Sequence, residues 1–159
     1  MCELRDGEAL LQSLDRVIPF GRSASGEVEF SDLFLVPQAH QVKRREVLRD
    51  WYIARAKEKI LERAQQYARE LGVKFSGAKI VDNRYRWGSC TVNSNINFNW
   101  RLIKAPMFVI DYVIVHELAH LMEASHTSRF WGIVRAKTPT MEKAKAWLKD
   151  QGQVLEQDI

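Results

Sequence analysis

Apolar side chains recur at helical spacing along residues 42–71. The repeating positions end just before a glycine, Gly72, and they are Val47, Trp51, Ala54, Ile60, Leu61, Ala64, Tyr67, Ala68 and Leu71. A stripe of this period is typical of an amphipathic helix with one buried face, and glycine is common just beyond a helix end. The pattern therefore predicts one long helix over residues 42–71.

The period changes after Gly72 from helical to strand-like. Residues 79–86 form a short β-like run, and residues 95–100 alternate polar and apolar side chains as Asn-Ile-Asn-Phe-Asn-Trp. Strict alternation indicates a strand that is buried on one side. Because Gly88-Ser89 is a turn signal between the two runs, they are predicted to pair as a hairpin.

Three helices are predicted in the C-terminal part of the chain. An almost wholly apolar helix spans residues 106–122 and starts at Pro106, a residue suited to the first helical turn. Thr127 or Ser128 is the candidate N-cap of a second helix that runs to Lys137, and a third is predicted over residues 140–148. Strands followed by helices without regular alternation indicate an α+β fold.

Residues 1–40 have the least regular pattern. Residues 4–17 show some helical spacing, and residues 28–36 have the character of a strand. The whole chain is 159 residues long, which is about one domain. We therefore expect one compact domain over residues 41–159, preceded by an N-terminal segment, residues 1–40, whose structure the pattern does not define.

The composition is that of a globular protein. Hydrophobic residues make up 46% of the chain and charged residues 28%, which excludes a disordered or fibrous chain. Only two cysteines occur, so no disulfide framework is expected, and acidic residues stand where a signal peptide would have basic ones. We expect a cytoplasmic protein. Because the apolar run over residues 106–122 contains two acidic residues and two histidines, no membrane partner is expected.

The pentapeptide His-Glu-Leu-Ala-His occupies residues 116–120, inside this apolar helix. Histidines four residues apart on a helix are separated by about 40° and about 6 Å of rise, so His116 and His120 can reach one metal ion. Glu117 lies to the side of this pair, where a carboxylate reaches a water on the metal, as a general base must. Burying these polar groups without a partner would cost several kcal/mol, which favours a metal site over ordinary core histidines.

His126 is the preferred third ligand. On an unbroken helix it would lie about 9 Å beyond His120 and point away from the metal, so the chain must turn after about Met122. Glu123 is a rival ligand on the same helix face, and Glu142 on the next predicted helix is a second rival. Three histidines would leave one coordination position open for water or substrate, as a catalytic zinc requires.

Four groups of residues follow one another in a specific order. They are Arg86-Trp87-Gly88-Ser89-Cys90, then Ile96-x-Phe98-Asn99-Trp100-x-Leu102 with Ala105-Pro106, then residues 111–120, and finally His126-x-x-x-Phe130-Trp131. Over about residues 41–150 the chain thereby resembles the YgjP-like metal-dependent hydrolases, which are related to the WLM and SprT-like zinc peptidases. The resemblance implies a zincin-like fold, in which a small, mostly antiparallel sheet packs on the long helix and the HExxH helix. It also implies one zinc ion held by His116, His120 and His126, with Glu117 as the catalytic base.

Four further residues are candidates for substrate contact. Asn97 and Asn99 line one face of the predicted strand over residues 95–100. In zincins an edge strand beside the active-site helix binds the substrate backbone by strand addition, whereas the plain alternative is a solvated face. Tyr112 lies one helical turn before His116, where it either contacts substrate or packs, and Arg86 either lines the cleft or forms a structural ion pair.

The expected function is a zinc-dependent hydrolase, in particular a peptidase, whose substrate is a peptide or protein. Imidazole ligands also suit nickel, cobalt and manganese, so other divalent metals remain candidates. The alternative function rests on residues 41–106, which carry 15 basic and 6 acidic side chains. This alternative is a metal-stabilised nucleic-acid-binding module or a DNA-associated protease, although acids interleaved along the helix favour an ordinary solvated face.

Overall fold

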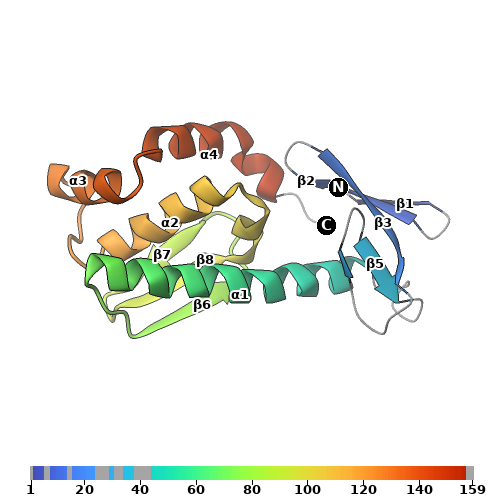
Figure 1. Ribbon diagram of the computed structural model, residues 1–159, viewed down its shortest axis with the longest axis horizontal. Helices are drawn as coiled ribbons and strands as arrows, with labels where there is room; N and C mark the ends of the chain where they lie inside the picture. The colour runs from blue at the N-terminus through green and yellow to red at the C-terminus, as the bar shows by residue number, and fades with distance from the viewer. Residues whose placement is uncertain are drawn as a thin grey trace.

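The computed structural model describes residues 2–5, 8–13, 16–23, 29–30, 34–37 and 44–156, with side chains placed for residues 45–153 and 155. Helix α2 (Met107–Ala119) lies between the long helix α1 (Arg44–Leu71) and helix α4 (Met141–Glu156) (Figure 1). A three-stranded sheet lies beside these helices, so the α+β class is confirmed. None of the helices in the described part of the chain is long and apolar enough to cross a membrane.

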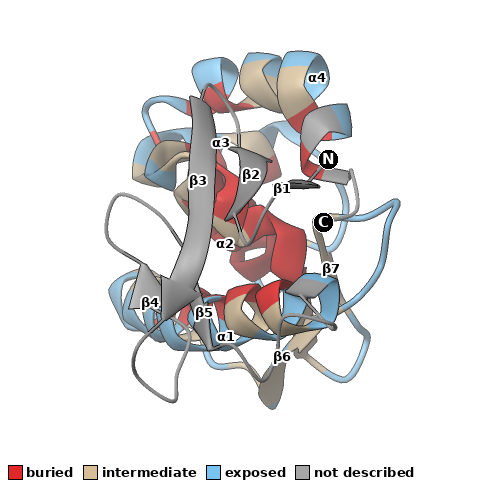
Figure 2. Cartoon of the chain, turned by 90° about the vertical axis from the view of Figure 1, so that its right-hand side faces the viewer, coloured by how far each residue is buried: buried red, intermediate tan, exposed pale blue. Residues whose placement is uncertain are grey.

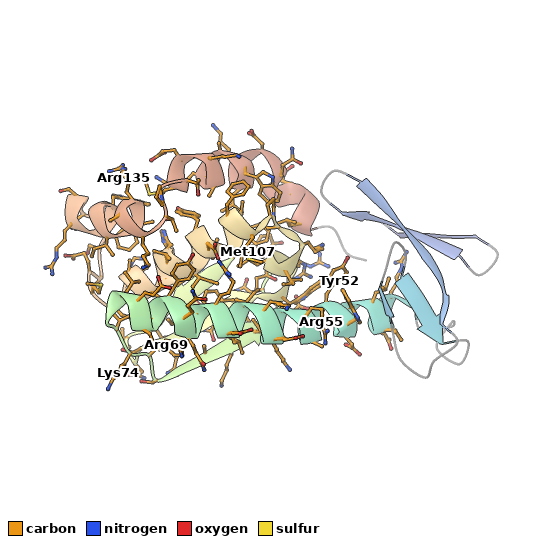
Figure 3. The ribbon with its side chains drawn as sticks, in the orientation of Figure 1. Tyr52, Arg55, Arg69, Lys74, Met107 and Arg135 are labelled. Atoms are coloured by element: carbon orange, nitrogen blue, oxygen red, sulfur yellow. The ribbon has the colours of Figure 1, made fainter. Side chains whose placement is uncertain are left out.

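Helix α1 confirms the long helix predicted over residues 42–71. It buries one stripe of side chains at four-residue spacing: Leu48, Tyr52, Ala56, Ile60, Ala64 and Ala68. Its opposite face is polar, with Arg55 and Arg69 exposed (Figure 3). Gly72 ends the helix with a φ of 70°, a left-handed conformation that glycine adopts without steric cost. The N–H of Val73 donates back to the carbonyl of Ala68 at 3.0 Å, which completes a Schellman-type end.

Helix α2 is the most buried of the α-helices in the described chain (Figure 2). It contacts α1, α4, helix α3 (Ser128–Lys137) and the sheet, so nearly every side of it faces protein. Its buried residues are Val109, Ile110, Tyr112, Val113, Ile114, Val115, Glu117, Leu118 and Ala119. This environment explains why the helix is apolar all round, and it makes the polar residues of α2 conspicuous.

The sheet has the strand order β6 (Gly77–Val81), β8 (Asn95–Asn99), β7 (Gly88–Cys90). Strand β8 is central, and its Ile96 and Phe98 are fully buried under the helices. Strand β7 pairs with β8 antiparallel, whereas β6 pairs with β8 in parallel, with Ile80 opposite Phe98. The sheet is therefore mixed.

The hairpin predicted between residues 79–86 and 95–100 is wrong, and so is the expectation of a mostly antiparallel sheet. Residues 82–86 are polar and exposed, so the first strand stops at Val81 and the chain crosses to the other side of β8 before it returns. The reversal of direction occurs later, where the N–H of Ser94 donates to Thr91 at 2.9 Å and Ser94 has a φ of 59°. The hairpin partner of β8 is consequently β7.

Side chains cap two of the C-terminal elements. The short 3₁₀ helix η2 (Trp100–Lys104) is capped by Asn99, whose side chain accepts from the N–H of Arg101 at 3.0 Å. Of the two candidate caps for α3, Thr127 is the cap, and it accepts from the N–H of Phe130 at 3.3 Å. The last predicted helix is confirmed as α4, which extends to Glu156, beyond the expected end at residue 148.

The N-terminal residues form a separate five-stranded sheet of order β1-β2-β3-β5-β4. Its strands are β1 (Cys2–Arg5), β2 (Glu8–Ser13), β3 (Arg16–Ser23), β4 (Glu29–Phe30) and β5 (Phe34–Pro37). The helical character predicted for residues 4–17 is therefore wrong. In place of the one strand predicted over residues 28–36, the structure has two short strands, β4 and β5. Strands β1 and β2 pair antiparallel, with Arg5 opposite Glu8.

Candidate metal centre

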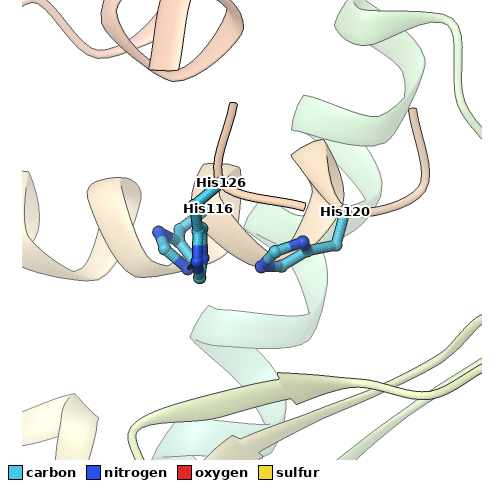
Figure 4. A group of neighbouring side chains, drawn as sticks. All are labelled: His116, His120 and His126. Atoms are coloured by element: carbon cyan, nitrogen blue, oxygen red, sulfur yellow. Dashed lines mark hydrogen bonds between the residues drawn. The ribbon is translucent and has the colours of Figure 1, made fainter. Parts of the chain in front are cut away.

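Three histidines come together where helix α2 ends (Figure 4). His116 lies in the last turns of α2, His120 is its C-cap, and His126 lies in the connection to α3. The helix stops at Ala119, three residues before the expected end at Met122. Although this connection contains neither Gly nor Pro, the His120 ring lies 3.1 Å, through Nδ1, from the carbonyl oxygen of Ala124. That contact stabilises the turn and returns His126 toward the helix.

The spacing of the imidazole nitrogens fits one metal ion. The ligand atoms of the three histidines all lie within 4.8 Å of one another, and the Nε2 atoms of His116 and His126 are 3.3 Å apart. Two nitrogens bound tetrahedrally to zinc at about 2.0–2.1 Å would be about 3.3 Å apart. Nδ1 of His120 donates to backbone carbonyls, which leaves Nε2 of that ring as the atom that can bind a metal.

Neither rival ligand belongs to this cluster of described side chains. Glu123 contributes its backbone carbonyl to the contact with His120, at 3.3 Å from Nδ1. The Glu142 side chain is 71% exposed and lies 3.8 Å from Arg135. The geometry thus favours His126 as the third donor.

Aromatic rings hold the three imidazoles in place. His126 stacks on Trp131, with ring centroids 5.4 Å apart and an interplanar angle of 20°. The fully buried ring of Phe130 lies 5.0 Å from His116 and 4.5 Å from His120, centroid to centroid. The contacts of Phe130 and Trp131 with the histidines could not be predicted from the sequence, because a pattern of spacing shows burial but not the neighbouring side chain.

Burial keeps His116 neutral. Desolvation, together with the smaller effects of the nearby charges of His120, His126 and Lys145, lowers the pKa of His116 to about 4. Its Nδ1 atom is buried and has no hydrogen-bond partner among the described residues. A neutral imidazole is the form that binds metals. The ring is therefore prepared for a metal across the neutral and mildly acidic range.

Glu117 projects from the buried helix against the backbone of Gly88. Glu117 is only 7% exposed, and this burial raises the pKa of its carboxyl group to about 7, although the charge of Arg86 acts to lower that pKa. A Cβ atom built on Gly88 would lie 2.7 Å from both Cγ and Oε1 of Glu117. Only glycine therefore leaves room for this carboxylate. In the sequence Gly88 is a turn signal, but in the structure it belongs to β7, and glycine inside a strand also signals close approach of another group.

An open cleft of about 740 Å³ leads to the metal centre. Its walls are the histidine cluster with Glu117 on one side and strand β7 with the following turn, residues 88–92, on the other. A second hollow of about 280 Å³ shares Arg86, Gly88, His116 and Glu117 with this cleft and continues to Tyr85 and Tyr112. The carboxylate of Glu117 thus lies between two accessible spaces.

The four residues predicted to contact substrate divide into two pairs. Tyr112 and Arg86 line the smaller hollow, and the Tyr112 ring lies 5.8 Å from that of His116. Asn99 is fully buried, and Asn97 donates to the hydroxyl of Ser89 at 3.3 Å. Both asparagines lie on the central strand β8, which is paired with β6 and β7 on its two edges, so strand addition of a substrate at these residues is excluded. The edge strand beside the cleft is β7.

The buried helix α2 carries His116, Glu117 and His120, and a third histidine, His126, lies beside them at an open cleft. This arrangement defines a metal-dependent hydrolase. The chain belongs to the YgjP-like family, whose metallopeptidase domain matches residues 15–151. The match begins well before residue 41, so it includes much of the N-terminal segment.

One solved structure is also similar to this chain. It is the crystal structure of the metallopeptidase zymogen of Pyrococcus abyssi abylysin, at 24% sequence identity and a TM-score of 0.49. The similarity covers 64% of this chain and 97% of that one. No curated protein matches the chain.

Proposed function

We propose that this metallopeptidase is a zinc enzyme in which His116, His120 and His126 hold the ion and Glu117 is the general base. The observation that carries the proposal is the convergence of three imidazoles and one buried carboxyl group on the same cleft. Structural zinc sites usually have four protein ligands, often cysteines, whereas three histidines leave a position open for water or substrate. The donor set therefore supports a catalytic site.

Zinc, when bound, supplies Lewis-acid polarisation of the peptide carbonyl and lowers the pKa of water. Glu117 then accepts the proton that the attacking water loses, and it passes this proton to the leaving amine. Its raised pKa, about 7, suits both transfers near neutral pH. Gly88 lets the carboxyl group approach the site, and the neighbouring hollow accommodates a substrate side chain beside Tyr112 and Arg86.

The substrate backbone binds along β7 in this proposal. Strand β7 pairs with β8 through one edge only in the described sheet, and its residues line the cleft. A peptide that lies antiparallel or parallel to β7 would extend the sheet and pass directly beside Glu117. Strand addition is sequence-tolerant, because the hydrogen bonds involve main-chain groups.

The nucleic-acid-binding alternative is not favoured. The family match indicates a peptidase, and several basic side chains of residues 41–106 have acidic partners. Arg63 forms a bidentate pair with Asp111, and Arg55 lies 3.2 Å from Glu58. Such pairing reduces the charge available to phosphate groups.

Metal analysis combined with a peptide-cleavage assay tests the proposal. Glu117→Gln is expected to retain one equivalent of zinc and to lose turnover by a factor of about 10² or more, since general base catalysis contributes about 10²–10⁴-fold. His126→Ala is expected to lose the metal, whereas Glu123→Gln, a control in the same turn, should keep both metal and activity. Wild-type turnover by Glu117→Gln would contradict the role of Glu117 as general base. Loss of metal from Glu123→Gln, but not from His126→Ala, would contradict the role of His126 as the third ligand.

A further inference from the structure

Trp131, in the first turn of helix α3, contacts two of the three histidines of the metal centre. Its ring stacks on that of His126, and it lies 5.7 Å, centroid to centroid, from the ring of His116 in an edge arrangement. These are the two histidines whose Nε2 atoms are 3.3 Å apart (Figure 4). Trp131 therefore helps to fix the pair of nitrogen atoms that one metal ion would join.

His126 depends on aromatic contacts more than His120 does. The His120 ring is oriented by contacts of its Nδ1 atom with the backbone carbonyls of Glu123 and Ala124. Among the residues that the structure describes, the His126 ring has one hydrogen-bond contact, with His116 across the metal position. His126 is also exposed, and it lies in the connection between two helices. Stacking on neighbouring rings is therefore what holds its imidazole in a fixed orientation.

Lys145, on helix α4, lies over the ring of Trp131. Its Nζ atom is 3.9 Å from the ring centroid, which is within the range of a cation–π interaction. The carboxylate of Glu142, one turn earlier on α4, lies 4.0 Å from the same ammonium, but this carboxylate is exposed and the pair is weak. The helix is fixed at this point, because Ala144 is fully buried. Lys145 thus connects α4 to the ring that holds His126.

The ammonium of Lys145 also acts on the metal centre through its charge. Burial is the main cause of the lowered pKa of His116, and the charge of Lys145 acts, more weakly, in the same direction. A positive charge near the site also repels a metal cation. The contact with Trp131 and the charge of the ammonium therefore have opposite effects on metal affinity, so an experiment can separate them.

We propose that Lys145 is a positioning residue, which holds the ring of Trp131 and thereby keeps His126 oriented to bind the metal. This inference rests on the proposed function, because it takes His126 as the third ligand. The series of contacts runs from α4 through α3 to the connection that follows α2. The packing of α4 is thereby coupled to metal affinity, although Lys145 itself does not touch the metal.

Zinc affinity tests this role independently of catalysis. It is measured on the full, metal-free chain by competition with a chelator. We expect Trp131→Leu to weaken zinc binding about tenfold, since mutation of a group that orients a metal ligand typically costs about 10–100-fold in affinity. Lys145→Gln should weaken it about fivefold, as the loss of one partly exposed cation–π contact predicts. Lys145→Arg should restore most of this loss, because a guanidinium also stacks on aromatic faces.

Lys143→Gln is the matched control. Lys143 lies on the same helix, with its Nζ atom 4.9 Å from the ring centroid of Phe108, so this variant removes the same charge and the same kind of contact at the other end of α2. It should leave zinc affinity nearly unchanged. In the Trp131→Leu background, Lys145→Gln should cause no further loss, because the lysine then has no indole ring to hold. The metal-free lysine variants should have similar thermal unfolding midpoints.

The positioning role is overturned if Lys145→Gln binds zinc as tightly as the wild type or more tightly, or if Lys143→Gln loses as much affinity. It is also overturned if the loss persists in the Trp131→Leu background, if Lys145→Arg restores nothing, or if Lys145→Gln unfolds at a much lower temperature than Lys143→Gln. Failure of the proposed function looks different, because His126→Ala would then keep its zinc. Loss of zinc from His126→Ala, with unchanged affinity in Lys145→Gln, would remove the positioning role alone.

Discussion

Adding one methyl group at Gly88 tests how closely β7 and the active-site helix must fit. In Gly88→Ala the new Cβ would lie 2.7 Å from Cγ and Oε1 of Glu117 and 2.9 Å from Cδ. Contacts of this kind relax at about 3.5 Å, so the carboxylate must move by about 0.8 Å. The strand cannot easily retreat, because Gly88 is paired with Phe98, which is fully buried.

This displacement sets the expected magnitude. A misplacement of about 1 Å can cost about 10²-fold in rate, which corresponds to about 2.7 kcal/mol of transition-state stabilisation. We expect the loss to fall mainly on kcat, because the histidines that hold the metal and the backbone edge of β7 keep their positions. Zinc content should remain that of the wild type.

The assay measures kcat, KM, zinc content and thermal unfolding for Gly88→Ala beside two other glycine variants. Gly132→Ala, on α3, places its Cβ in open space, and it should change neither kcat nor metal content. Gly77→Ala also introduces a close contact, 2.9 Å from Oδ1 of Asn95, but on the far strand of the sheet. If Gly88→Ala keeps kcat within twofold of the wild type, or if Gly77→Ala loses as much, the proposed fit between Gly88 and Glu117 is refuted.

Three further predictions concern stability. Asp111→Asn removes the bidentate pair between Arg63 of α1 and α2, with contacts of 2.5 and 2.7 Å, and it should lower the unfolding free energy by about 1–2 kcal/mol in urea titrations; no change would show that the pair is neutral. Arg101 lowers the pKa of Asp82, so the pair stabilises the fold above the unfolded pKa of about 3.9 and this contribution is lost as pH falls further; the stability difference between wild type and Asp82→Asn should shrink in acid. Thr127→Ala removes the cap of α3 directly after His126, so it should cost about 1 kcal/mol and weaken zinc binding, measured by denaturation and by chelator competition; unchanged metal affinity would separate the cap from the site.

The helices could be predicted from the sequence because each has a long apolar stripe and a recognisable end. Gly72 ends α1 as expected, and the boundaries of α3 follow the capping signal at Thr127. The buried stripe of α1 nevertheless centres on Leu48 and Tyr52, with Val47 and Trp51 only partly buried. Spacing gives the period of a helix accurately, but the rotation of its buried face depends on the partner.

The strands were harder to predict, because a period of two indicates which face is buried and not which strand lies alongside. The pairing of β6 with β8 joins residues far apart in the chain, and it depends on where the chain leaves the sheet after Val81. The same limit explains the candidate site. His116, His120 and His126 could be predicted as metal ligands from their spacing in the sequence. The contact of Gly88 with Glu117 could not, because it forms only in the folded molecule.

The placement of the site on α2 has a consequence for how this family can diverge. The helix that supplies His116, Glu117 and His120 also fills the centre of the core, so a substitution there alters folding and chemistry together. The rim of the cleft is different: Arg84, Tyr85 and Arg86 of the loop after β6 are exposed, and none of them belongs to the buried core. Relatives with new substrate preferences should therefore differ first in this loop and along β7, while the interior of α2 stays nearly invariant.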